Sequence, residues 1–204
     1  MLTAFVTLVI ALFILLTLYL GIKIVRQSEV LVIERLGKYS RTLNAGLSII
    51  IPYIERVAHR VSILERQLDK QEISVITKDN VEVRLETIVF YRVTDAANSV
   101  YRIRNIDDAL KNASSSIVRS AAGKLELDEL QSSRDAMNEE IAINLGRAAE
   151  VWGIEITRTE ITDVIIDDET KEAQRQQLNA ERTKRATIAT AEGDKASIQL
   201  KADA

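Results

Sequence analysis

The sequence predicts an α+β protein with an N-terminal transmembrane helix, an antiparallel sheet with packed helices, and a long C-terminal helix. Three observations lead to this prediction. The chain opens with an uncharged apolar run. Its middle changes between the alternation typical of strands and the three- and four-residue spacing typical of helices. Its end favours helix but has few large apolar side chains. The length of 204 residues suits one or two domains.

The first segment, MLTAFVTLVIALFILLTLYLGI, predicts a membrane anchor over residues 1–24. As a helix its 22 residues would be about 33 Å long, close to the ~30 Å hydrocarbon core of a bilayer. A cleaved signal peptide would need a basic start and a small-x-small cleavage site, and neither is present. Lys23 and Arg26 follow the run, so the positive-inside rule predicts a single-pass protein with its N-terminus outside and its body in the cytoplasm.

Positive charge is concentrated directly after this anchor. Residues 23–60 hold seven basic and three acidic side chains, whereas residues 61–204 hold 20 basic and 27 acidic ones. An anionic lipid surface would attract the first of these segments. The overall net charge of −3 does not indicate nucleic-acid binding. The absence of cysteine excludes disulfides and thiolate metal sites.

The stretch after the anchor begins with an aliphatic run at Val30–Ile33, and Gly37 and Gly46 suggest turns around it. The segment LSIIIPYI follows and contains Pro52, the one proline of the sequence. Two interpretations are open. The residues alone favour a buried strand ended by proline. The alternative is an apolar loop that dips into the membrane interface beside the anchor.

The middle of the chain predicts strand, two helices and strand. NVEVRLETIVFYRV alternates almost strictly, as a half-buried antiparallel strand does. WGIEITRTEITDVII returns to strand character, and its alternation changes phase near Arg158, which indicates a bulge or bend. Gly123 and Gly153 suit the ends of the helices between them. The apolar stripes of those two helices are Ile106, Leu110, Ala113, Ile117 and Ala121, and then Met137, Ile141, Leu145 and Ala148.

The last segment, residues 167–204, predicts one long polar helix. Asp167, Asp168 and Glu169 suit a helix N-terminus, and neither glycine nor proline follows before Gly193. AEG at 191–193 and ADA at 202–204 are offset by 11 residues, which is close to the natural helix period and lets neighbouring helices run nearly straight side by side. A solvated single helix or a frayed tail is the alternative.

No residue pattern indicates catalysis. His59 is the only histidine, and neither a G-x-S-x-G nor an S-x-x-K motif occurs. The serines at Ser114–Ser116 are interpreted as the polar face of a helix. The acids at 167–169 lack the spaced ligands of a calcium loop, and no glycine-rich phosphate loop is present. The sequence therefore predicts a non-enzyme without catalytic residues, cofactor or metal site, and a protease with a Ser–Lys pair stays an alternative.

Several blocks, taken in order, resemble one known family. They are ERLGKYSRTLNAGLSIIIP, VITKDNVEV, VFYRVTD, IVRSAAGKLELDEL, WGIEITRTEI and AERTKRATIATAEG. The chain resembles the SPFH or band 7 superfamily of stomatin, prohibitin, flotillin and HflK/C, and within it the bacterial stomatin-like branch. It departs from the family by Ala45-Gly46 in place of a frequent Pro-Gly and by the lack of prolines after the last strand. Family members usually extend well beyond residue 204, so a longer native chain is expected.

The resemblance implies an organisation and a function. A membrane-proximal SPFH subdomain is expected over 25–78, a second SPFH subdomain over 79–166 and the start of a coiled-coil-like helix over 167–204. The implied protein is a homo-oligomeric scaffold, a ring or cage that encloses a membrane microdomain and regulates membrane proteins or proteases. Its implied partners are its own copies, membrane lipids, and an FtsH-type membrane protease or an NfeD-like protein, and its implied location is a bacterial inner membrane. A monomeric or small-oligomer lipid-binding module is the alternative.

Two groups of site residues follow from this resemblance and from the two stretches above. The membrane-interface residues are Ile49, Ile50, Ile51, Pro52, Tyr53, Arg56 and Arg60. The oligomer-interface residues are Glu181, Arg182, Lys184, Arg185, Ile188, Ile198 and Leu200. Alanines would allow close approach of neighbouring helices, and the mixed charges would pair between them.

Overall fold

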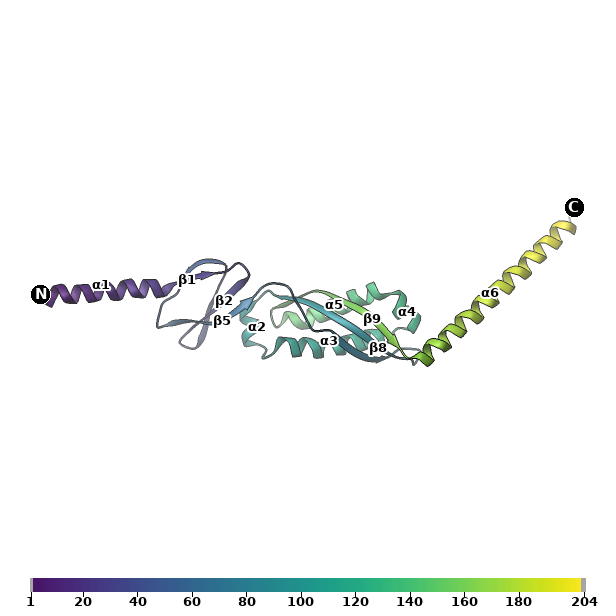
Figure 1. Cartoon of the computed structure of the whole chain (residues 1–204), viewed down its shortest axis with the longest axis horizontal. Helices are drawn as coiled ribbons and strands as arrows, with labels where there is room; N and C mark the ends of the chain where they lie inside the picture. The colour runs from purple at the N-terminus through teal and green to yellow at the C-terminus, as the bar shows by residue number, and fades with distance from the viewer. Residues whose placement is uncertain (1, 203–204) are drawn as a thin grey trace.

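The computed structural model describes the backbone of residues 2–202 and the side chains of residues 5–173, 175–193 and 195. The molecule is elongated (Figure 1). Helix α1 (Leu2–Gly21) lies at one end and helix α6 (Asp168–Ala202) projects from the other, with two packed β-containing subdomains between them. The α+β class with antiparallel sheets and a C-terminal helix is confirmed.

Helix α1 forms where the apolar run predicted it, and its side chains from Phe5 to Leu20 are almost all exposed. It ends at Gly21, three residues earlier than the predicted anchor, because Ile22 and Lys23 already pair in a strand. In the described part of the chain no helix reaches the length and apolar character required of a membrane span. The predicted transmembrane span is therefore not found, and the side chains of its first four residues lie outside the described ones.

The membrane-proximal subdomain contains a two-stranded and a three-stranded sheet, both antiparallel. Strand β2 is buried on both faces, which explains its aliphatic run. One face packs on Val25, Leu43 and Ile50, and the other packs on Ala96 of helix α2. The elements are β1 (Ile22–Val25) paired with β4 (Gly46–Ile49), and β2 (Glu29–Arg35) between β3 (Lys38–Leu43) and β5 (Glu55–Ser62).

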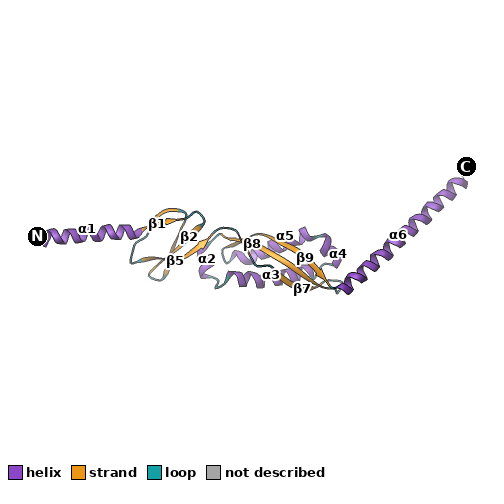
Figure 2. Cartoon of the chain, viewed as in Figure 1, coloured by secondary structure: helices purple, strands orange, loops and turns teal. Residues whose placement is uncertain are grey.

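The second subdomain is a four-stranded antiparallel sheet around β8, with helices packed on it (Figure 2). Strand β8 alternates between buried and more exposed residues, as predicted. Its buried side chains pack with α3 and α5 in two adjoining clusters. The strands are β6 (Arg66–Gln67), β7 (Gln71–Ile76), β8 (Glu82–Val93) and β9 (Ile154–Ile166), and the helices are α2 (Ala96–Tyr101), α3 (Ile106–Ala122), α4 (Leu127–Ser132) and α5 (Arg134–Glu150).

Several local predictions for this subdomain are confirmed, and three differ. Helix α3 ends at Ala122 with Gly123 as its C-cap, and the pairing of β8 with β9 shifts register beside Arg158. Ala149, rather than Ala148, completes the buried stripe of α5. Ser114 is fully buried and so does not belong to a polar helix face. The predicted boundary at 78/79 also differs, because β6 and β7 both pair with β8, and the two sheets therefore separate between the end of β5 and the start of β6.

Helix α2 joins the two subdomains, and Gly153 sets its position. The Gly153 carbonyl accepts hydrogen bonds from the backbone N–H groups of Thr94 and Asp95, 2.9 and 3.0 Å long. Gly153 has a φ of +70°, and a Cβ there would lie 2.5 Å from the Asp95 carbonyl oxygen. Both observations require glycine at this position.

Helix α6 begins as the acidic start predicted. The Asp167 carboxylate accepts a 2.5 Å hydrogen bond from the Thr170 backbone N–H. This bond holds the pKa of Asp167 below its ordinary value. The helix projects away from the body, and its described side chains beyond the first turn are exposed (Figure 1).

Candidate membrane-facing surface and exposed C-terminal helix

An apolar surface lies next to the end of α1. Strands β1 and β4 place Ile22 opposite Ile49 and Ile24 opposite Leu47, so these four side chains share one face. All four are exposed, between 46% and 78%. Val25, one position out of phase with them, is buried in the core on the other face. The two strands thus turn isoleucine and leucine outward where a soluble sheet would place polar residues.

The loop after β4 extends this surface. Ile51, Tyr53 and Ile54 are exposed, whereas Ile50, directly before them, is only 5% exposed. Ile50 inserts into the core cluster with Val25, Leu31, Ile33 and Leu43. We name the exposed apolar side chains of β1, β4 and this loop the apolar edge, which consists of Ile22, Ile24, Leu47, Ile49, Ile51, Tyr53 and Ile54.

The end of α1 touches this loop closely. The Ile50 backbone N–H donates a 2.8 Å hydrogen bond to the Gly21 carbonyl. A Cβ on Gly21 would lie 2.8 Å from the Ile50 carbonyl oxygen, so a larger residue would push the loop away. The rings of Phe13 and Tyr53 stack with centroids 6.3 Å apart. Helix and loop therefore meet at both backbone and side chains.

A buried carboxylate lies under the loop. The side chain of Glu55 is fully buried and accepts hydrogen bonds from Arg35 (2.7 Å) and Arg41 (2.9 Å to each oxygen). It also accepts a 3.0 Å bond from the Ile51 backbone N–H. The bond from Arg35 is the largest cause that lowers the pKa of Glu55 to about 2, followed by the bond from Ile51. The group is therefore ionised and its lone pairs are satisfied.

A second carboxylate, Glu34, connects the two subdomains. It accepts hydrogen bonds from Arg56 (2.7 Å) on β5 and from the Tyr101 hydroxyl (2.8 Å) on α2. The Arg56 bond is the main cause that lowers the pKa of Glu34. Burial and this carboxylate raise the pKa of Tyr101 to about 12. His59 meets the edge of the same tyrosine ring.

The predicted membrane-interface residues therefore have different locations. Ile49, Ile51 and Tyr53 are exposed on the apolar edge, and Pro52 is half-buried among them. The prediction for Ile50 is wrong, because alternation along this segment turns its side chain into the core. Arg56 is exposed and pairs with Glu34, whereas Arg60 lies four strand positions further along β5, roughly 13 Å away at strand spacing.

Sequence reasoning missed part of this surface. Ile22 and Ile24 were predicted to belong to the anchor, and Leu47 was left out of the membrane-interface residues, although IKIV and GLSI both alternate. Glu55 was counted only as one acid among basic residues. No local pattern marks it as buried, since its two arginine partners lie 14 and 20 positions away.

The predicted oligomer residues lie on the exposed part of α6. Arg185 donates a 2.7 Å hydrogen bond to Glu181, one turn earlier in the same helix. Arg182 and Lys184 are exposed, and Ile188 is 48% exposed. Ile198 and Leu200 lie outside the described side chains.

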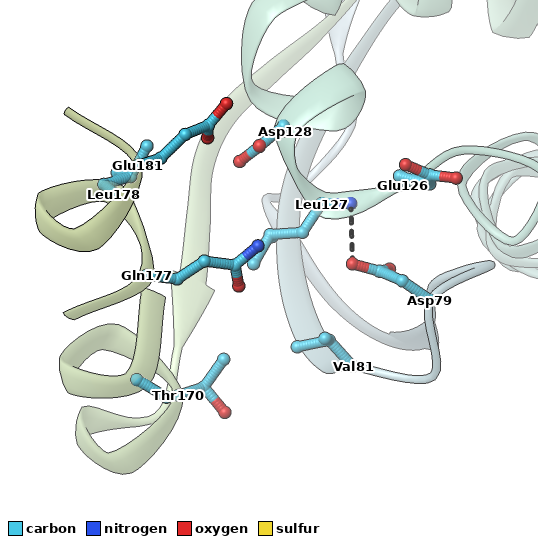
Figure 3. A pocket seen from close by; sticks show the side chains of 10 residues that line it. Asp79, Val81, Glu126, Leu127, Asp128, Thr170, Gln177, Leu178 and Glu181 are labelled. Carbon is cyan, nitrogen blue, oxygen red and sulfur yellow. Dashed lines mark hydrogen bonds between the residues drawn. The ribbon is translucent and has the colours of Figure 1, made fainter. Parts of the chain in front are cut away.

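A pocket of about 450 Å³ lies between the first turns of α6 and the body (Figure 3). Gln177 and Leu178 of α6 face α4 across it, and Asp79 accepts a 3.4 Å bond from the Leu127 backbone N–H. Four of its lining residues are acidic, namely Asp79, Glu126, Asp128 and Glu181. Among the described residues no group of three or more acidic or histidine side chains is arranged to hold a metal ion.

Comparison with known proteins agrees with this architecture. The model of the SPFH domain / Band 7 family matches residues 23–195. A stomatin homolog of Pyrococcus horikoshii is 38% identical over 195 residues, which are 96% of this chain and 73% of that protein. Human mitochondrial stomatin-like protein 2 is 34% identical over 173 residues, 85% of this chain and 49% of that protein.

An uncharacterized protein of Methanothermobacter thermautotrophicus is 38% identical over 190 residues, 93% of this chain and 59% of that protein. The chain thus spans about half to three fifths of the length of two of these three relatives. The matched region begins just after α1, includes both subdomains and reaches into α6. The chain belongs to the SPFH / band 7 family.

Proposed function

We propose that this protein is a membrane-bound, homo-oligomeric scaffold whose apolar edge and α1 contact the lipid and whose α6 helices assemble with those of neighbouring copies. Family membership supports a membrane-associated scaffold in general. The observation that carries the proposal is the apolar edge itself. Seven exposed apolar side chains gather beside an apolar helix, and contiguous exposed patches of this kind mark interaction surfaces.

Lipid is the partner that fits this edge best. Basic residues occur on the strands of the same subdomain, with Lys23 on β1, Arg26 just after it, Lys38 on β3 and Arg56 on β5. Each basic side chain near an anionic membrane contributes about 1 kcal/mol of attraction. Apolar side chains contribute further as they leave water. A protein partner would not require basic residues in this subdomain together with an adjoining apolar helix.

Fluorescence quenching in proteoliposomes tests the lipid contact. The chain has no cysteine, so Ile51→Cys introduces one labelling position. A fluorophore there should be quenched by phospholipids brominated along the acyl chain. Ile76→Cys is the matched control, because Ile76 is 62% exposed but lies on β7 of the second subdomain. Equal quenching at both positions, or none at Ile51, would refute the membrane contact.

We also propose the single-pass topology, with the N-terminus outside and the body in the cytoplasm of a bacterial inner membrane. Lys23 and Arg26 directly after α1 support it. Ser40→Cys, on β3, should resist membrane-impermeant thiol reagents in intact cells and react after lysis. Rapid labelling in intact cells would contradict this orientation.

Assembly into a ring or cage is supported by α6. Its 35 residues are almost wholly polar and small, and its described side chains after the first turn are exposed. Neighbouring copies would supply the missing contacts. Mass photometry in detergent should give a mass many times the 22.8 kDa of one chain. A monomer or small oligomer would favour the alternative, a simple lipid-binding module.

Regulation of a membrane protease, of the FtsH type or through an NfeD-like protein, is the proposed outcome of such an enclosure. The other alternative, a Ser–Lys protease, has less support, because Ser114 is fully buried and shielded from substrate. Labelling of the purified chain with a serine-directed probe would establish that alternative, and the absence of labelling is the result we expect.

A further inference from the structure

Glu55 forms hydrogen bonds with both polar groups of the Ile51 backbone. The Ile51 N–H donates to the Glu55 carboxylate (3.0 Å), and the Ile51 carbonyl accepts from the Glu55 backbone N–H (2.8 Å). Arg41 adds to this hydrogen-bond network, because it donates to the Glu55 carboxylate and also to the Ile49 carbonyl (3.0 Å). One buried carboxylate is thus connected to both residues whose apolar side chains flank Ile50.

These bonds determine which side chains face outward. Ile50 is fixed by its hydrogen bond to Gly21 and by its place in the core. Ile49 is held by its pairing with Ile22 in the β1–β4 ladder. Ile51 follows β4, has no strand partner and is 49% exposed, so packing does not fix its side chain. The hydrogen bonds to its backbone hold it outward instead.

We infer that Glu55 is a positioning residue, which holds Ile51 in the outward arrangement that enters the lipid. The inference rests on the proposed membrane contact. A buried, charged side chain would then orient an exposed apolar one. The loop would have its membrane-binding shape before it meets the bilayer.

Glu34 provides a matched control. It is also a buried glutamate that accepts a 2.7 Å bond from an arginine, and it lies in the same sheet. Its partners are Arg56 on β5 and Tyr101 on α2, and neither of them lies in the loop. Glu34→Gln and Glu55→Gln therefore each remove one buried charge from the same subdomain, and only the second one releases Ile51.

The experiment measures quenching of the fluorophore at Ile51→Cys by brominated lipid in three backgrounds of the full chain. With native Glu55 the label should be quenched, Glu34→Gln should retain that quenching, and Glu55→Gln should lose more than about half of it, because a neutral amide forms weaker bonds to Arg35 and Arg41. Circular dichroism and protection of the β8 amides check the fold in each case. If Glu55→Gln does not fold, Arg41→Gln replaces it and should show the same loss.

The outcomes separate the two claims. Absence of quenching with native Glu55 would refute the proposed membrane contact and the inference with it. Quenching that persists in Glu55→Gln would overturn the inference and leave the membrane contact standing. Equal loss in Glu34→Gln and Glu55→Gln would also overturn it, because the effect would then reflect general stability of the subdomain.

Discussion

Three consecutive isoleucines offer a direct test of how the loop is built. Ile50 is 5% exposed and packs in the core of the membrane-proximal subdomain, whereas its neighbour Ile51 is 49% exposed. Ile50→Ala removes three carbon groups from a buried site. At about 0.8 kcal/mol per group the loss of burial amounts to roughly 2.4 kcal/mol. The cavity that remains adds to this, so a cost of about 2–4 kcal/mol is expected.

Ile51→Ala should change the same free energy by less than about 0.5 kcal/mol, because surface substitutions rarely do more. Hydrogen exchange of the β2 amides in the full chain measures the opening of this subdomain. A cost of about 2–4 kcal/mol corresponds to exchange that is roughly 30- to 700-fold faster in Ile50→Ala. The measurement needs no membrane contact, so it tests the core assignment alone. Unchanged β2 exchange in Ile50→Ala, or acceleration only in Ile51→Ala, would show that the two side chains are assigned the wrong way round.

Three further predictions use other parts of the molecule. The folded pKa of Glu55, about 2, is below its ordinary value of 4.5, so its contribution to stability is complete above pH 4.5 and lost as the pH falls toward 2. In urea unfolding, the difference between native protein and Glu55→Gln should therefore shrink across this interval, and a constant difference would contradict it. Gly153→Ala should cost at least about 1–3 kcal/mol through backbone strain and the clash with Asp95, and thermal melts comparable to the native one would refute that. Reversing the charges of Arg182 and Arg185 should reduce the assembled mass in mass photometry, most at low salt, and an effect that does not depend on salt would exclude a charge-based seam.

The sequence predicted those parts of the fold in which neighbouring residues carry the information. Strand β8 and helices α3 and α5 have a strong periodicity of their own, and Asp167 starts α6 by a bond to a residue three positions away. The boundary between the subdomains was harder to predict from the sequence. Strands β6 and β7 are short, and only their pairing with β8 shows that they belong to the second sheet.

The candidate site was predicted in part for the same reason. The exposure of Ile49 and Ile51 follows from local alternation once the inward position of Ile50 is known. That position depends on β2 and β3, which supply Leu31 and Ile33, 19 and 17 positions earlier, and Leu43. The buried position of the Glu55 carboxylate likewise depends on ion pairs with Arg35 and Arg41, which are separated from it in the sequence. Contacts between distant residues leave no periodic pattern, so they were found only in the folded chain.

The arrangement of the two proposed contact surfaces constrains how they could work together. The apolar edge lies beside α1 at one end of the molecule, and α6 leaves from the opposite end (Figure 1). A protein held in lipid at the first end would therefore bring its α6 helices together away from the bilayer. The subdomains are connected at the junction near α2, through the bond from Asp95 to Gly153 and the bond from Tyr101 to Glu34. We therefore expect substitutions at this junction to alter the geometry of the assembly even though they touch neither lipid nor α6. Tyr101→Phe removes only the hydroxyl that binds Glu34, so it offers a mild test. Images of its assemblies should show a broader spread of diameters than those of the native protein, and an unchanged distribution would locate the rigidity elsewhere.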